Sequence, residues 1–398
     1  MQINSPKLFI EINNAEYIFA VGDENDKENF KLIYKSIVPI QGIKSSKIID
    51  FNLVFNTIKK NIYIIEQKLN YTFKETILII NNVNYTFINL TGFKKLNGSQ
   101  ILKENITYIL NSLKSCIDRY EDKKTILHIF NSQYLLDKKS IENLPIGLFG
   151  DFYSHELSFC LISKNDYKNL ISIFNNCNLK IKKILLRNFV EGSLTSNHHS
   201  EINTFFQIKI NENSSQLFYF ENDSLKFEQN FEFGSDLIAK DISKITSLKI
   251  DIVKKILSNN KLHREISDDL LLEKEFFGDE NFRKIKKKLF YQIAEARIQE
   301  LSEIMISKNV NLLNFNKTNK IIFLRIEDKL HHSCFCDVYS FFFSHNNNFK
   351  VKYTDSVATE DLIKNANQIV HFGWKKEAVP VIQSKRSLIS RFFDTIFR

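Results

Sequence analysis

Apolar residues in this chain follow two different periods in turn, and a chain with that pattern must combine strands with helices. In residues 8–12 and 17–21, on either side of an Asn-Asn turn, large apolar side chains recur at every second position, which predicts a β-hairpin. Residues 51–69 instead carry apolar side chains at helical spacing after an N-cap at Asp50, and residues 75–81 have the pattern of a buried strand. The pattern indicates an α/β fold.

The alternation of strands and helices continues through the rest of the chain. The expected strands are 125–130, 157–163, 181–187, 205–210 and 216–220, and the expected helices are 102–117, 167–177 and 290–305. A polar stretch, 191–201, interrupts the pattern near the middle of the chain. We place the boundary between two halves there.

Glycine is scarce, with ten residues in 398, or about 2.5% where about 7% is usual. Loops that cradle phosphate need glycine because the backbone must approach the ligand closely. The composition therefore argues against a glycine-rich nucleotide site.

Charge and cysteine content exclude several other classes of protein. The net charge is +9, but the basic residues are scattered and form no recognition motif, so no nucleic-acid partner is expected. Five cysteines at irregular positions predict free thiols. His331, His332, Cys334 and Cys336 lie too close together in sequence for one tetrahedral ion, so no metal site is expected.

The last fourteen residues, 385–398, separate into an apolar and a charged side when they are wound as a helix. The apolar side is Leu388, Ile389, Phe392, Phe393, Ile396 and Phe397, and the flanking basic residues are Arg386, Arg391 and Arg398. This pattern is typical of a helix that lies on an anionic membrane surface. The alternative is a terminal helix docked on its own domain.

Five blocks of the chain resemble, in order, segments of the actin-like bacterial cell-division family FtsA. They are Gln41–Asp50, Leu144–Gly150, Phe233–Ile242, Glu295–Arg297 and Val370–Gly373, and the amphipathic C-terminus is a sixth. For example, residues 144–150 read Leu-Pro-Ile-Gly-Leu-Phe-Gly, where the family has N-P-[IV]-G-[LM]-x-G. Each block is weak alone, and their common order across the chain makes the resemblance fairly specific.

The resemblance implies an actin-like (ribonuclease H-like) two-domain fold with the inserted subdomain of that family. The implied divisions are residues 1–84 with 164–200 for the first domain (1A), 85–163 for the inserted subdomain (1C), 201–242 with 306–374 for the second domain (2A), 243–305 for subdomain 2B, 375–384 for a linker and 385–398 for the membrane-targeting helix.

The implied function is that of a cell-division adaptor and not of an enzyme. By resemblance, the chain would grip the C-terminal peptide of FtsZ through subdomain 2B and tether it to the cytoplasmic face of the inner membrane at the septum. Filament formation and binding of later divisome proteins are implied in the same way. The alternatives are a cytoplasmic platform protein of a type IV pilus-type system and an actin-fold ATPase or kinase.

The nucleotide motifs of the family are lost. Its first hairpin reads [DE]-[IL]-G-[TS]-x-K, but residues 11–16 read Glu-Ile-Asn-Asn-Ala-Glu; its second reads D-[IL]-G-G-G-T-x-D, but residues 209–216 read Lys-Ile-Asn-Glu-Asn-Ser-Ser-Gln. The T-G-G turn beside the adenosine is replaced by residues 324–328. Glutamates at positions 16 and 212 would repel phosphate.

Little or no binding of the family's ATP and magnesium is therefore expected, and no other cofactor. The remaining matches at this degenerate cleft are Glu11, Gly234 and Asp241. Gly234 and Asp241 have an alternative explanation as a turn glycine and a helix-capping acid.

Overall fold

The computed structural model divides into two compact units, and each is described by itself. Unit 1 contains residues 1–203, 221–226 and 357–398, and unit 2 contains residues 204–220 and 227–356. The described residues are 6–24, 30–44, 46–81, 83–259, 267, 269–277, 281–313, 315, 321–345, 349–374 and 376–377. The amphipathic segment 385–398 lies outside them. None of the helices in the described part of the chain combines the length and the apolar composition of a transmembrane span.

The first sheet of unit 1 has five strands in the order β11-β6-β1-β2-β3. They are β1 (Pro6–Ile12), β2 (Glu16–Glu24), β3 (Phe30–Pro39), β6 (Glu75–Ile80) and β11 (Lys180–Leu186). The predicted hairpin is confirmed, because β1 and β2 pair antiparallel with Ile12 opposite Tyr17. β6 runs parallel to both β1 and β11.

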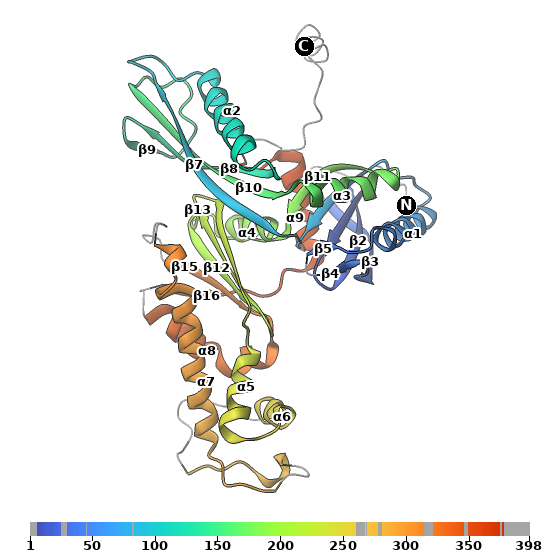
Figure 1. Cartoon of the computed structure of the whole chain (residues 1–398), viewed down its shortest axis with the longest axis vertical. Coiled ribbons are helices and arrows are strands. Elements are labelled where there is room, and N and C mark those ends of the chain that lie inside the picture. The colour runs from blue at the N-terminus through green and yellow to red at the C-terminus, as the bar shows by residue number, and fades with distance from the viewer. Residues whose placement is uncertain are drawn as a thin grey trace. The chain divides into compact units, whose positions relative to one another are not determined.

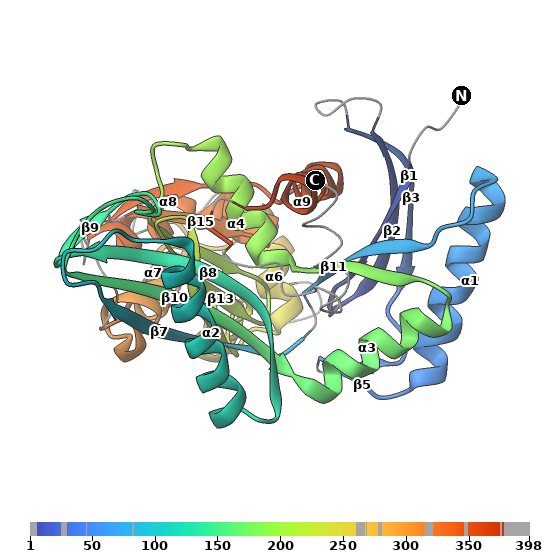
Figure 2. The same cartoon turned by 90° about the horizontal axis from the view of Figure 1, so that it is seen from above.

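Helices cover both faces of this sheet, and Figure 2 shows α1 and α9 on opposite sides of β1–β3. The helices of this part are α1 (Phe51–Leu69), α3 (Lys164–Asn176), α4 (Arg187–His198) and α9 (Thr359–Phe372), and a small ribbon is formed by β4 (Ile43–Lys44) and β5 (Lys47–Ile48). The predicted cap of α1 is confirmed, because Asp50 accepts a hydrogen bond from the Leu53 amide at 2.9 Å.

The second sheet of unit 1 has the order β7-β10-β8-β9 and lies within residues 85–163 (Figure 1). Its strands are β7 (Tyr85–Lys95), β8 (Lys124–Leu136), β9 (Lys139–Ile141) and β10 (Phe152–Ser163), and α2 (Lys103–Tyr120) packs against β7. Gly92 allows this packing, since a Cβ there would lie 2.4 Å from Ile109 Cγ2. We call these strands the inserted sheet.

Unit 2 is built on a five-stranded sheet in the order β14-β13-β12-β15-β16. The strands are β12 (Phe205–Ile210), β13 (Ser215–Glu221), β14 (Ser224–Phe231), β15 (Ile321–Ile326) and β16 (Lys350–Tyr353). The helical segments are α5 (Asp236–Thr246), α6 (Ile250–Asn259), η1 (Lys274–Phe276), α7 (Lys287–Ser302), η2 (Glu303–Ser307), η3 (Val310–Leu312) and α8 (Lys329–His345). The mixed α/β class is confirmed in both units.

The polar stretch 191–201 is largely helical and not an irregular segment, although the first boundary between the two units does follow it closely, between residues 203 and 204. It falls mostly in α4, whose polar side chains are buried because they bond within unit 1. Ser193 Oγ donates to Val190 O at 2.8 Å, and the Asn365 amide donates to Val190 O at 2.8 Å and to Ser193 Oγ at 2.7 Å. Apolar spacing cannot identify a helix whose buried face is polar.

Two boundaries differ from those implied by the resemblance. Residues 357–374 were assigned to the second domain with 306–356, but the structure groups them with unit 1. The reason is the bonding of Asn365 to α4 and of Lys7 Nζ to Asn367 Oδ1 at 3.3 Å. The expected linker, 375–384, also begins too early, because Lys376 and Glu377 are bonded to β8.

Candidate functional site

The first candidate phosphate loop is the turn between β1 and β2, and its amides are already in use. Asn13 Oδ1 accepts hydrogen bonds from the Ala15 amide at 2.8 Å and from the Glu16 amide at 2.7 Å. The Asn13 amide in turn donates to Glu16 O at 3.1 Å. A phosphate held by this turn would have to displace a side chain of the turn itself.

Glu11, just before this turn, belongs to a buried cluster of charged side chains. Glu11 and Glu191 are each 1% exposed, and both carboxylates contact the guanidinium of Arg187, the first residue of α4. Burial raises the pKa of Glu11 even though Arg187 opposes the shift. Burial alone would lower the pKa of Arg187, but the two carboxylates outweigh it and raise the pKa.

This cluster gives Glu11 an internal partner in place of a bound cation. One carboxylate oxygen of Glu11, Oε2, is buried without a hydrogen-bond partner among the described residues. Glu11 and Arg187 form a buried ion pair at the C-terminal end of β1. No group of three or more His, Cys, Asp or Glu side chains in the described part of the chain is arranged to hold a metal ion.

The second candidate loop is the turn between β12 and β13, and it is closed onto the start of α5. The carbonyls of Asn211 and Glu212 accept hydrogen bonds from the amides of Ser235 at 3.0 Å and Asp236 at 2.9 Å. These amides belong to the first turn of a helix, where an anion would otherwise bind. The backbone of the hairpin occupies them instead.

Gly234 makes this closure possible. A Cβ at Gly234 would lie 2.2 Å from Asn211 O and 2.4 Å from Glu212 O, both backbone atoms. Its missing side chain is therefore needed for contact between two protein segments, in agreement with its alternative explanation as a structural glycine.

Acidic side chains surround the same turn. Glu212 pairs with Lys254 at 2.8 Å, and Ser235 Oγ donates to Asp328 Oδ2 at 3.2 Å. Asp236 pairs with Lys240 one turn along α5. A phosphate placed here would meet three carboxylates, and two of them already have their own lysine.

Asp241 has a different role from the one that its motif suggested. It lies in the middle of α5, so it does not cap the helix, and its carboxylate contacts Arg297 of α7. Arg297 also contacts Glu300 at 2.6 Å. The pair joins α5 to α7 within unit 2.

Sequence reasoning missed the residues that fill the two turns. Asn13 could have been found, because an asparagine two or three residues before free amides commonly bonds to them. Arg187 could not, because nothing in its local sequence links it to Glu11. The candidate anchor residues in 385–398 lie outside the described residues, so their role stays a prediction.

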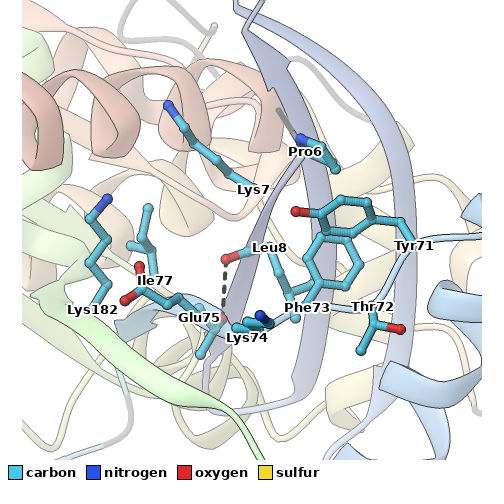
Figure 3. A pocket seen from close by; sticks show the side chains of 11 residues that line it. Pro6, Lys7, Leu8, Tyr71, Thr72, Phe73, Lys74, Glu75, Ile77 and Lys182 are labelled. Atoms are coloured by element: carbon cyan, nitrogen blue, oxygen red, sulfur yellow. Dashed lines mark hydrogen bonds between the residues drawn. The ribbon is translucent and has the colours of Figure 1, made fainter. Parts of the chain in front are cut away.

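A cavity of about 460 Å³ lies at the other end of β1, beside the starts of β6 and β11 (Figure 3). Its lining combines aromatic side chains with lysines, among them Tyr71, Phe73, Lys74 and Lys182. Thr76 also lines it, and its hydroxyl donates to Leu8 O at 3.1 Å. No motif in the sequence indicated this cavity.

Comparison with known proteins favours one of the families considered for this chain. The chain is 21% identical over 301 residues to "Cell division protein FtsA" of Buchnera aphidicola subsp. Schizaphis graminum. The aligned region is 74% of this chain and 71% of that protein. The chain is also 21% identical over 310 residues to the protein of the same name in Bacillus subtilis, covering 76% and 70%. This chain is an FtsA-like actin-fold protein.

The fold of the FtsA-like chain is also found among solved structures. It superposes on a chain of the PilM-PilN type IV pilus biogenesis complex with a TM-score of 0.50, covering 93% of this chain and 97% of that one. At 9% identity this similarity shows the fold alone. No protein-family model matches the chain.

Proposed function

We propose that this FtsA-like protein is a non-enzymatic adaptor of bacterial cell division, which tethers FtsZ to the cytoplasmic face of the inner membrane at the septum. The observation that carries the proposal is the similarity to curated FtsA proteins over about three quarters of the chain. The proposal is supported by the sequence blocks that resemble the family, which follow the family's order from Gln41 to the C-terminal segment.

The adaptor works with little or no bound ATP. Both turns that would cradle phosphate have amides bonded to protein atoms, at Ala15 and Glu16 in unit 1 and at Ser235 and Asp236 in unit 2. Enzymatic phosphoryl transfer needs a positioned metal and phosphate, so this arrangement favours a scaffold over an ATPase or kinase.

The FtsZ C-terminal peptide binds in the region 243–305, which contains α6 and α7. We assign no individual contact there. Self-association into filaments and recruitment of later divisome proteins complete the proposed role, and several tails on one filament would hold the membrane more firmly than one.

The membrane contact is made by 385–398. Its six large apolar side chains would enter the interface, while Arg386, Arg391 and Arg398 face anionic head groups, each worth on the order of 1 kcal/mol.

The test is co-sedimentation with anionic phospholipid vesicles and a fluorescent peptide of the FtsZ C-terminus. Full-length protein should pellet with the peptide, and a version that ends at Gln383 should not pellet. Phe392→Asp should release the protein, whereas Thr395→Asp adds the same charge on the polar side and should retain most of the binding. If full-length and shortened protein remain in solution alike, the membrane tether is wrong.

A second candidate is a cytoplasmic platform protein of a type IV pilus-type system, because the chain shares its fold with a chain of the PilM-PilN complex. That role requires neither the FtsZ peptide nor the terminal helix. This candidate would be favoured if the protein binds neither the FtsZ peptide nor the vesicles although its melting curve shows that it is folded.

A further inference from the structure

The chain does not leave unit 1 at the end of α9. Residues 374–377, which we call the strap, continue onto the inserted sheet. The Asn131 amide of β8 donates to Lys376 O at 2.6 Å, and Phe130 forms an antiparallel bridge with Glu377. The Glu377 amide donates back to Trp374 O at 2.8 Å, so the strap makes a turn before it meets β8.

Glu377 inserts its carboxylate between the two sheets of unit 1. Oε1 lies 3.0 Å from His128 Nδ1 on β8, and Oε2 lies 2.5 Å from Lys183 Nζ on β11. The side chains of Glu377 and His128 are 3% and 0% exposed. A carboxylate buried this deeply persists because both its oxygens have polar partners.

Trp374 fixes the other end of the strap. Its indole Nε1 donates to Asp223 O at 2.9 Å, and its ring packs edge-on against Phe189 with centroids 6.2 Å apart. Gly373, just before it, has φ +75° and nothing within 4 Å of the position of a Cβ. The backbone can therefore bend at Gly373, and the strap that follows is attached through the buried side chains of Trp374 and Glu377.

The strap occupies part of a strand edge that is otherwise little used. β8 pairs with β10 along its length, from Lys124 to Leu136, and its other described partner, β9, covers only residues 134–136 of β8. Unpaired strand edges are places where another extended segment adds on. Here the segment is the root of the C-terminal tail.

We propose that the strap fixes the point at which the tail leaves unit 1, so that the membrane surface is held next to the inserted sheet. This inference rests on the proposed membrane role of 385–398. Glu377 acts as a positioning residue: it touches no lipid itself and determines from which part of unit 1 the tail begins.

The segment between Glu377 and the expected membrane helix is short, so the residue at which it starts limits how far unit 1 can lie from the membrane. Seven residues, 378–384, separate Glu377 from the expected helix, and at about 3.6 Å each they reach at most about 25 Å. With the strap detached, the tether would start after Gly373 and its eleven residues would reach about 40 Å. Detachment would therefore let unit 1 move away from the lipid and reorient.

Trp374 is the only tryptophan in the chain, so its fluorescence reports the strap directly. The experiment compares the wild-type protein with Glu377→Gln in solution and on anionic vesicles that contain a dansyl-labelled head group. Glu121→Gln is the matched control, since it makes the same change in a partly exposed ion pair with Lys124 at 3.1 Å.

In solution, Glu377→Gln should shift the Trp374 emission to longer wavelength. It should also speed tryptic cleavage after Lys376 about tenfold or more, because the largely buried Lys183 ammonium loses its counter-ion and the hydrogen bonds to position 377 weaken. On vesicles, the wild type should keep its blue emission and transfer energy from Trp374 to the dansyl group efficiently. Glu377→Gln should lose much of this transfer, and Glu121→Gln should match the wild type.

Unchanged emission and cleavage in Glu377→Gln would overturn the strap. A red shift of wild-type Trp374 on vesicles would show that membrane binding opens the strap, which overturns its positioning role. If the wild type does not bind vesicles, the membrane tether fails and the positioning role with it, although the solution measurements would still show whether Glu377 holds the strap.

Discussion

The Arg187 guanidinium contacts the Glu11 carboxylate, and this pair closes the end of β1 from the first turn of α4. Glu11 is the residue that still matches the first nucleotide motif, yet its side chain is 1% exposed and bonded to protein. Burial raises the pKa of Glu11, with Arg187 acting against the shift. An acid in this setting contributes to the structure of unit 1 more directly than to ligand binding.

Arg187→Met should destabilise unit 1 by about 3–5 kcal/mol, because Glu11 and Glu191 would be left as two buried carboxylates without their cation. Urea unfolding followed by Trp374 fluorescence at pH 7 measures this loss, since Trp374 belongs to the same unit.

The double variant Arg187→Met with Glu11→Gln tests the cause. It should recover a large part of the loss, because one of the two unpaired charges is removed. A loss below about 1 kcal/mol in the single variant would mean that the pair is solvated and that its apparent burial has little effect.

Mg-ATP should leave the melting temperature unchanged within error at 1 mM. A dissociation constant near 100 μM would add about 1.4 kcal/mol at that concentration and raise the melting temperature by roughly 3–5 °C. Differential scanning fluorimetry, with magnesium alone as the reference, distinguishes these cases. A rise of several degrees would mean that the cleft binds nucleotide through contacts unrelated to the lost motifs.

Local sequence patterns predicted the elements that are stabilised by short-range contacts or by one apolar face. The helix 51–69 has its cap at Asp50 and one buried stripe, so sequence and structure agree at both ends. The hairpins of β1 with β2 and β12 with β13 follow from period-two alternation around polar turns. The resemblance located both candidate turns, and the loss of the family's glycines there predicted weak nucleotide binding, which stays a prediction.

The sequence could not show which distant groups would replace a ligand. Arg187 is 176 residues from Glu11, and Glu377 is 249 residues from His128. Such pairings depend on how strands are ordered in the sheets, which short-range periodicity does not encode. The strap was missed for the same reason, because Lys376 and Glu377 have the composition of an ordinary linker.

Gly234→Ala should destabilise unit 2 by about 1–3 kcal/mol, because the new Cβ would press on two backbone carbonyls that cannot move as freely as a side chain. Ser235→Ala is the control: it removes the hydroxyl bonded to Asp328 but keeps the backbone contact, and should cost less. Thermal melting of both variants measures the difference. Equal losses would show that the hydroxyl, and not the close approach, holds the turn on α5.

Two buried histidines should make unit 1 sensitive to mild acid. Burial lowers the pKa of His155 to about 4 from its ordinary value of 6.5, and burial also lowers the pKa of His128. Both are neutral when folded, so between pH 6.5 and 4 the unfolded chain binds more protons than the folded one. Stability is therefore fully present above about pH 6.5 and is lost as pH falls toward 4.

For His155 alone the loss by pH 5 should be about 2 kcal/mol. His155→Gln keeps a donor toward Asn131 Oδ1, which lies 2.9 Å from His155 Nε2, but cannot titrate. Urea unfolding of both proteins at pH 7 and pH 5, followed through Trp374, isolates the contribution of this residue, because other groups titrate alike in the two proteins. The variant should lose less stability between the two pH values, and equal losses would show that His155 takes up its proton in the folded state.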